Sequence, residues 1–270
     1  MAKLPKRAAE RIVSGLKRFQ PILTSAKARD VNESDTVVIV TDLLQEVFGY
    51  DKYAEITSEH VIRGTYCDLA VKLNGRLAFL IEVKAIGLDL KEQHIKQAVD
   101  YAANQGCEWV ALPNGVVWRV YRVCFSKPIE HELVVDLDLL SVNPRKPDDV
   151  ELVGLLATEG WQMAHLGEYH SQRQALSRFT VAALILTDPV AEVLRREIRR
   201  LSPEVRVDVE QVKAVIEAEV LKRDVLEGEK AEAARKQIAR AANRALRVKA
   251  EAVGVLAPAA APPEAPAPPA

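Results

Sequence analysis

The sequence predicts an α/β core followed by a helical C-terminal extension. Two observations support this fold class. Over residues 33–125, helical patterns alternate with short apolar runs of the kind that form strands. After Pro147 the chain becomes strongly charged and helical in pattern. Because helices and strands alternate in the first segment, we expect its sheet to have both local and crossover connections.

Capping and turn residues divide the first segment into elements. Asn32 precedes a helix that begins at Glu33 and that Gly49 ends. Asn74-Gly75 is a hairpin signal, and Pro113-Asn114-Gly115 is a second turn between apolar runs. After the capped helix we expect three strands, a helix and a pair of strands, over residues 53–63, 66–73, 77–87, 90–104 and 108–123.

The same patterns predict four segments along the chain. Residues 1–30 are a helical lead-in, and residues 31–146 are the α/β domain. Residues 147–256 are the helical extension. Residues 257–270 are almost entirely Ala and Pro, a composition that cannot form a core, so we expect a disordered tail.

Composition limits the class of protein. The 270 residues are 49% hydrophobic, which suffices for a substantial core, and the net charge is only −1. A nucleic-acid partner would therefore need a local basic patch. The three cysteines form no CxxC pair, and neither the basic N-terminus nor the run VAALIL resembles a secretory signal or a membrane span. We expect a cytoplasmic protein without membrane contact.

The run LAFLIEVKAIG, residues 77–87, contains two charged side chains in an otherwise apolar strand. Glu82 and Lys84 are two positions apart and therefore share one face. Charges in a buried strand are costly unless they are paired or bind a metal. The two interpretations are a Glu–Lys pair on a half-exposed strand and a functional site.

The hairpin register decides which charges share a face. A two-residue turn at Asn74-Gly75 would separate Asp68 from Glu82 and Lys84. A three-residue loop, with Gly75 left-handed, makes one face uniformly apolar and gathers Asp68, Glu82 and Lys84 on the other. The pairs expected in this second register are Val71 with Leu77, Leu69 with Phe79, and Cys67 with Ile81. The burial pattern favours the second register.

Two neighbouring carboxylates indicate a divalent cation. At about 4 Å they repel each other by roughly 1 kcal/mol in water and about 4 kcal/mol at an effective dielectric constant of 20. Oxygen ligands of this kind suit Mg²⁺ or Mn²⁺, and Lys84 beside the metal could hold a water or a phosphate oxygen. Hydrolysis of a phosphate ester by a metal-activated water is the corresponding reaction.

Five short motifs in order extend this pattern beyond one strand. They are Glu33, Cys67-Asp68, Ile81-Glu82-Val83-Lys84, Gln97-Ala98-Val99-Asp100-Tyr101 and Leu112-Pro113-Asn114-Gly115. Over roughly residues 30–125 the chain resembles the PD-(D/E)xK nuclease superfamily, and more closely the N-terminal nuclease domain of the R subunit of type I restriction enzymes. The resemblance implies a restriction-endonuclease-like core, a mixed sheet flanked by helices, over residues 31–146.

The resemblance also implies roles for individual residues. Asp68 and Glu82 would ligate Mg²⁺ or Mn²⁺ with the carbonyl of Val83, and Glu33 would be a further acidic ligand. Lys84 would act on the attacking water or on the scissile phosphate. Gln97 and Tyr101 lie one helical turn apart, and the family uses them near the active site and the DNA. At Glu33 the helix start alone favours an acidic residue, and Glu59 is a lesser candidate.

At three points this sequence departs from the family pattern, and these departures limit the function that the resemblance implies. Cys67 stands where the family has proline, and Pro113 replaces the threonine of its T-N-G turn. No GxxxxGK[ST] motif occurs, so the ATP-driven motor of a type I R subunit is missing. The chain is expected to be a DNA endonuclease of a restriction or defence system, alone or with other subunits. The alternative is a non-catalytic nucleic-acid-binding or scaffold module of a defence or repair complex.

Two features of the extension have more than one interpretation. The pairs Arg195-Arg196 and Arg199-Arg200 could contact phosphates or form a solvated helix face. The Val/Ile/Leu stripe over residues 207–221 could pack within the chain or form a homodimer.

Overall fold

The computed structural model describes residues 3–62, 65–125 and 127–254, with side chains outside 59–66 and 245–254. The chain forms two compact units, Met1–His170 and Ser171–Ala270. We describe each unit by itself. The predicted tail at residues 257–270 lies outside the described residues.

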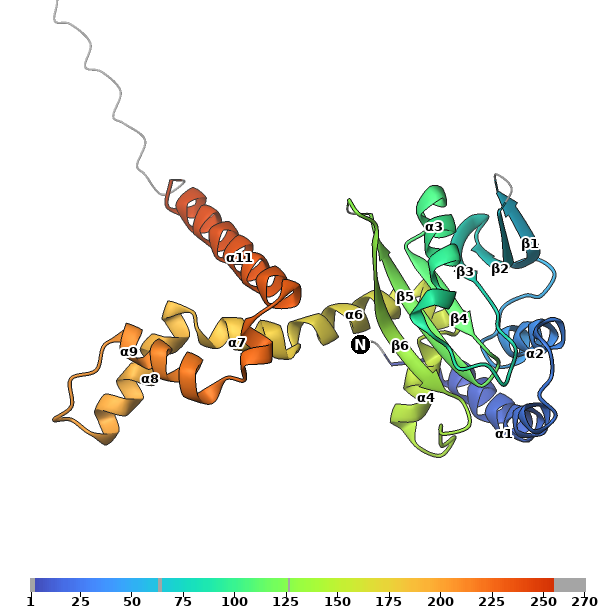
Figure 1. Ribbon diagram of the computed structural model, residues 1–270, viewed down its shortest axis with the longest axis horizontal. Coiled ribbons are helices and arrows are strands. Elements are labelled where there is room, and N and C mark those ends of the chain that lie inside the picture. Colours follow the sequence, from blue (N-terminus) through green and yellow to red (C-terminus); the bar gives the residue numbers. More distant parts are fainter. Residues whose placement is uncertain (1–2, 63–64, 126, 255–270) are drawn as a thin grey trace, which may run out of the picture. The chain divides into compact units, whose positions relative to one another are not determined.

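The first unit is built on a six-stranded mixed sheet (Figure 1). Its strands are β1 (Ile56–Ile62), β2 (Thr65–Leu73), β3 (Arg76–Ile81), β4 (Trp109–Pro113), β5 (Val117–Cys124) and β6 (Glu130–Asp138). Spatial order follows chain order, and all neighbours are antiparallel except β3 and β4. The parallel step requires a crossover, which the 3₁₀ turn η1 (Glu92–His94) and helix α3 (Lys96–Gln105) supply. The predicted α/β class is confirmed.

Strand β6 is an element that the sequence did not predict. It pairs with β5 along its whole length, but its first four residues are exposed or only partly buried, and its segment reads EHELVVDLD. Val134 and Val135 are both buried although they are adjacent. A register shift opposite them, between Val120 and Tyr121, breaks the alternation on which strand recognition relies.

Both faces of the sheet are covered. Helices α1 (Lys6–Ala28), α2 (Glu33–Glu46) and α4 (Pro147–Gly154) pack on the face that carries Leu69 and Ile81. Helix α3 packs on the other face, where it buries Ala70 and Leu80. Strands that are covered on both faces are mostly apolar on both sides. A charged side chain among them therefore needs a partner that compensates its charge.

The segments before and after the sheet domain belong to the same unit as the sheet. Arg11 of α1 makes a bidentate pair with Glu159, with N–O distances of 2.7 and 2.6 Å. The Tyr50 hydroxyl donates to the Leu156 carbonyl at 2.9 Å, and Gln20 donates to the Leu139 carbonyl at 2.8 Å. The division between the units falls after residue 170, inside helix α6 (His165–Ala175), whereas the sequence prediction ends the α/β domain at residue 146.

The β2–β3 hairpin differs from the predicted register. Leu73 pairs with Arg76, so the turn has two residues, and both Asn74 (φ 52°) and Gly75 (φ 74°) are left-handed. The register then shifts between Val71 and Lys72. The observed pairs are Val71 with Phe79 and Leu69 with Ile81, so the predicted pairs are wrong by two residues. A shift of two residues leaves the faces of these four side chains unchanged, and Leu69, Val71, Phe79 and Ile81 are buried together as expected.

The second unit is helical. Its elements are α7 (Arg178–Ile185), α8 (Asp188–Leu201), α9 (Val209–Val215), the π-helical turn η2 (Ile216–Val220), α10 (Arg223–Leu226) and α11 (Glu229–Gly254). Val212 and Ile216 of the predicted stripe pack against Ala191 of α8. Gly228, at φ 89°, separates α10 from α11 in a segment whose pattern predicts uninterrupted helix. Among the described residues, no helix combines the length and the apolar character needed to cross a membrane.

Candidate functional site

The structure brings two acidic side chains together where β3 ends. Leu69 and Ile81 form the last pair of the β2–β3 ladder, and Asp68 and Glu82 are the residues next to that pair. The charge of Asp68 acts on the Glu82 carboxyl. The Asp68 carboxylate accepts a hydrogen bond from the backbone N–H of Val83 at 2.7 Å. In the predicted register Asp68 would have faced Leu80. In the structure Leu80 pairs with Ala70 instead.

Lys84 completes a compact group of charges. Its Nζ lies 2.7 Å from Oε1 of Glu82 and 3.7 Å from Oε2 of Glu33. The Glu82 side chain is 10% exposed and that of Lys84 is 16% exposed, whereas that of Glu33 is 49% exposed. Removing one partner from a buried ion pair typically costs about 3–5 kcal/mol, so the pair holds both side chains in place.

Burial and neighbouring charges alter the acid–base properties of this group. Burial raises the pKa of Glu82, the hydrogen bond from Lys84 opposes that rise, and the charge of Asp68 adds to it. Burial alone would lower the pKa of Lys84, but the hydrogen bond to Glu82 and the charges of Glu82, Glu33 and Asp68 together raise it. Lys84 therefore keeps its positive charge at neutral pH. Further positive charge near Glu82 would stabilise the ionised form of its carboxyl group.

Strand β4 fixes the backbone that carries Glu82 and Lys84. The N–H of Glu82 donates to the Ala111 carbonyl at 3.0 Å, and the N–H of Lys84 donates to the Pro113 carbonyl at 2.9 Å. Parallel pairing thus continues past the end of β3 and holds both charged residues in extended conformation. Pro113 supports the site through its backbone carbonyl. This contact does not need the hydroxyl of the threonine that the family has at this position.

Asn114 is a supporting residue whose role the sequence did not indicate. Its side chain is 6% exposed, and its Oδ1 accepts from the N–H groups of Val116 (3.1 Å) and Val117 (2.7 Å). Its Nδ2 donates to the Leu88 carbonyl at 3.0 Å. Asn114 therefore ties the β4–β5 turn to the loop that follows Lys84. The available signal was the Asn-Gly pair itself, which predicts a turn but not this tether.

We expect Asn114→Ala to lower the free energy of unfolding of the first unit by about 1–3 kcal/mol, because it removes three hydrogen bonds and leaves the buried N–H of Val116 without this partner. Asn104→Ala is the matched control, since Asn104 is exposed on α3 and its replacement should change stability by less than about 0.5 kcal/mol. All three tryptophans, Trp109, Trp118 and Trp161, lie in the first unit, so their fluorescence during urea unfolding reports on that unit. Equal stabilities of the two variants would contradict the tether.

The remaining predicted site residues have different surroundings. Glu33 begins α2, where the side chain of Asn32 caps the helix and the helix dipole favours an acidic residue, and it also approaches Lys84. Gln97 is exposed on α3. Tyr101 is 3% exposed and packs in the apolar cluster that contains Cys67. The side chain of Glu59, in β1, lies outside the described residues.

Cys67, which stands in place of a proline, is buried rather than reactive. It packs with Ala70 and Leu80 and not with Leu69 and Val71 as the predicted register implied. Its thiol donates to the Ile81 carbonyl at 3.0 Å. Burial, with the charges of Glu82 and Asp68, raises its pKa to about 12. The Cys67 side chain therefore packs in the same apolar cluster as α3, from the strand that also carries Asp68. Its thiol is not a nucleophile at neutral pH.

The donor set fits a hard divalent cation of the Mg²⁺ type. Mg²⁺ is commonly held by one or two carboxylates, with waters and substrate phosphates completing the shell. Asp68 and Glu82 supply two such carboxylates, and the charge of Asp68 already acts on the pKa of Glu82. Among the residues that the structure describes, no cluster of three or more His, Cys, Asp or Glu side chains is arranged for a metal. Any cation here would therefore depend on water and substrate for its other ligands.

No protein-family model matches this chain, and comparison with curated proteins and with solved structures also gives no match. The resemblance to the PD-(D/E)xK nucleases thus depends on the motifs in this sequence alone.

Proposed function

We propose that the chain is a Mg²⁺-dependent DNA endonuclease with a restriction-endonuclease-like core. The observation that carries the proposal is the grouping of Asp68, Glu82 and Lys84 where a buried strand ends. Lys84 pairs with Glu82, the charge of Asp68 acts on Glu82, and the Asp68 carboxylate accepts from the Val83 N–H. A surface Glu–Lys pair would not require a third charge opposite it, or a backbone held by β4. The choice of DNA as substrate comes from the resemblance.

In the proposed reaction Asp68, Glu82 and the Val83 carbonyl would hold the metal, which would supply an activated water and neutralise charge on the scissile phosphate. Lys84 holds its ammonium next to Glu82, where it stabilises charge that develops on the phosphate or orients the attacking water. Glu33 keeps the ammonium directed toward the site from α2. Gln97 and Tyr101, on α3, are assigned to supporting roles.

Purified protein is expected to convert closed circular plasmid DNA to nicked or linear forms in the presence of Mg²⁺ or Mn²⁺, and to leave it intact in EDTA. Cutting of circles, which have no ends, identifies an endonuclease. The measurement is gel electrophoresis of plasmid and linear DNA over time.

The matched control is Asp68→Asn, prepared and assayed in the same way. It keeps an oxygen that can accept from Val83 and removes the charge. Metal-dependent cutting that is equal in Asp68→Asn and wild type would contradict this site. Metal-independent binding of DNA without cutting by the wild type would favour the non-catalytic alternative.

A further inference from the structure

The second unit contains an open groove lined by three arginines. Arg195 and Arg199 lie one turn apart on α8, and Arg206 comes from the segment that leads into α9. The groove has a volume of about 430 Å³. Three cations that line one groove repel one another unless acids or a bound anion compensate them.

The groove is only partly compensated by its own acids. Arg195 makes a bidentate pair with Glu192, with N–O distances of 2.8 and 2.5 Å. The Asp208 carboxylate accepts from the N–H of Gln211 at 2.8 Å and so caps α9. Within the described part of the chain, neither Arg199 nor Arg206 has a carboxylate within ion-pair distance. Two guanidinium groups are left to bind an external anion.

The charge of the chain is distributed unevenly. Residues 1–170, which include the candidate site, contain 24 acidic and 20 Lys or Arg residues. Residues 195–206 contain five arginines and two glutamates. A polyanion therefore gains no net attraction from the first unit and would be attracted by this short segment.

We propose that the groove formed by Arg195, Arg199 and Arg206 binds phosphate groups of a nucleic-acid backbone. This inference rests on the proposed function only for the choice of DNA as the nucleic acid. The guanidinium fork matches two phosphate oxygens, which a single ammonium does not. The groove is exposed to water, so a single small anion gains little there. A polymer presents successive phosphates and releases counterions as each is neutralised.

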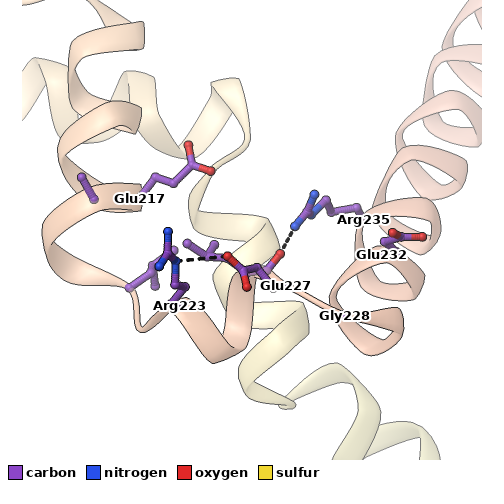
Figure 2. A pocket seen from close by; sticks show the side chains of 9 residues that line it. Glu217, Arg223, Glu227, Gly228, Glu232 and Arg235 are labelled. Carbon is purple, nitrogen blue, oxygen red and sulfur yellow. Dashed lines mark hydrogen bonds and ion pairs between the residues drawn. The ribbon is translucent and has the colours of Figure 1, made fainter.

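A second groove in the same unit is unsuited to binding a polyanion (Figure 2). It is larger, about 720 Å³, but Glu217, Glu227 and Glu232 outnumber its two arginines. Arg223 pairs with Glu227 at 3.2 Å (Figure 2). Arg235 donates to the Leu226 carbonyl. Because acidic side chains outnumber arginines in its lining, this groove does not attract a polyanion.

The test compares two double variants that lose the same charge from nearly the same place. Arg199→Ala with Arg206→Ala removes the two groove arginines for which the described residues provide no ion pair. Arg196→Ala with Arg200→Ala removes two exposed arginines of the same region that do not line it. Fluorescence anisotropy of a labelled 20-base-pair duplex, in EDTA and over a range of salt concentrations, measures binding without cutting.

The groove variant is expected to bind at least about 10-fold more weakly than wild type, and the slope of log K against log salt should fall by about 2. The control variant should lose less than about 3-fold. Equal losses in both variants would mean that overall charge is responsible. No loss in the groove variant, or no binding by the wild type, would also overturn the inference.

Two further measurements separate this inference from the proposed function. Binding is repeated in a Lys84→Ala background, where groove-dependent binding without cutting upholds the groove whatever the outcome for catalysis. Cutting by a groove variant that binds like wild type would uphold the nuclease and overturn the groove.

A competition experiment with inorganic phosphate distinguishes a polymer from a small anion. Displacement of the duplex at low millimolar phosphate would indicate a small-anion site instead.

Discussion

Lys84→Ala is expected to reduce DNA cutting by at least about 100-fold while DNA affinity stays within a few-fold of wild type. Removing one preorganised group that stabilises transition-state charge typically costs about 10²–10³ in rate. A single phosphate contact among several contributes only part of the binding free energy. Initial rates of plasmid cutting and duplex anisotropy in EDTA give the two quantities.

Lys84→Ala also removes the partner of a buried carboxylate, so its controls have to separate catalysis from folding. Lys84→Arg keeps a cation beside Glu82 and should keep the unfolding midpoint, but its planar head group cannot occupy the position of the ammonium. Lys52→Ala loses the same charge from a pair with Asp42 elsewhere on the unit, and it should cut normally. Cutting by Lys84→Ala at the wild-type rate would place the nuclease activity at another site or in a contaminant.

The hairpin illustrates how much of the site the sequence could predict. Alternation determines which face a side chain occupies, and a shift of two residues leaves that unchanged, so the common face of Leu69, Val71, Phe79 and Ile81 was predictable. The pairing of these residues was not. It follows from the register shift between Val71 and Lys72, for which the local sequence gives no signal.

The residues that support the site were harder to predict from the sequence than the charged residues of the site itself. Short motifs indicate chemistry because a few residue types at fixed spacing are needed for it, and they led to Glu82 and Lys84. The tether from Asn114 to the Leu88 carbonyl joins residues 26 positions apart, and no local pattern encodes it. The same applies to Arg11 and Glu159, which extend the unit well past the end predicted from composition.

Asp68→Asn provides the test of the metal that does not require activity. Asparagine keeps the volume of the side chain and an oxygen that can accept from the Val83 N–H, so the fold should be preserved. Asp148→Asn, at an exposed position in the first turn of α4, is the control for loss of one carboxylate. Tryptophan fluorescence again reports on the first unit alone, with and without Mg²⁺ or Mn²⁺.

In wild type and in Asp148→Asn, saturating Mg²⁺ or Mn²⁺ is expected to raise the unfolding temperature of the first unit, and in Asp68→Asn the rise should disappear. A ligand that binds only the native state at about 100 times its Kd stabilises it by about 2.7 kcal/mol. For a unit of this size that corresponds to a rise of roughly 5–11 °C. The physical reason is the environment of Glu82, whose buried carboxylate is affected by the charge of Asp68 and only partly compensated by Lys84. A cation stabilises the two carboxylates together, and with one of them neutral the remaining charge is already paired with Lys84. Equal rises in all three proteins would show that the metal binds elsewhere, and Asp68 and Glu82 would then be a structural charge pair.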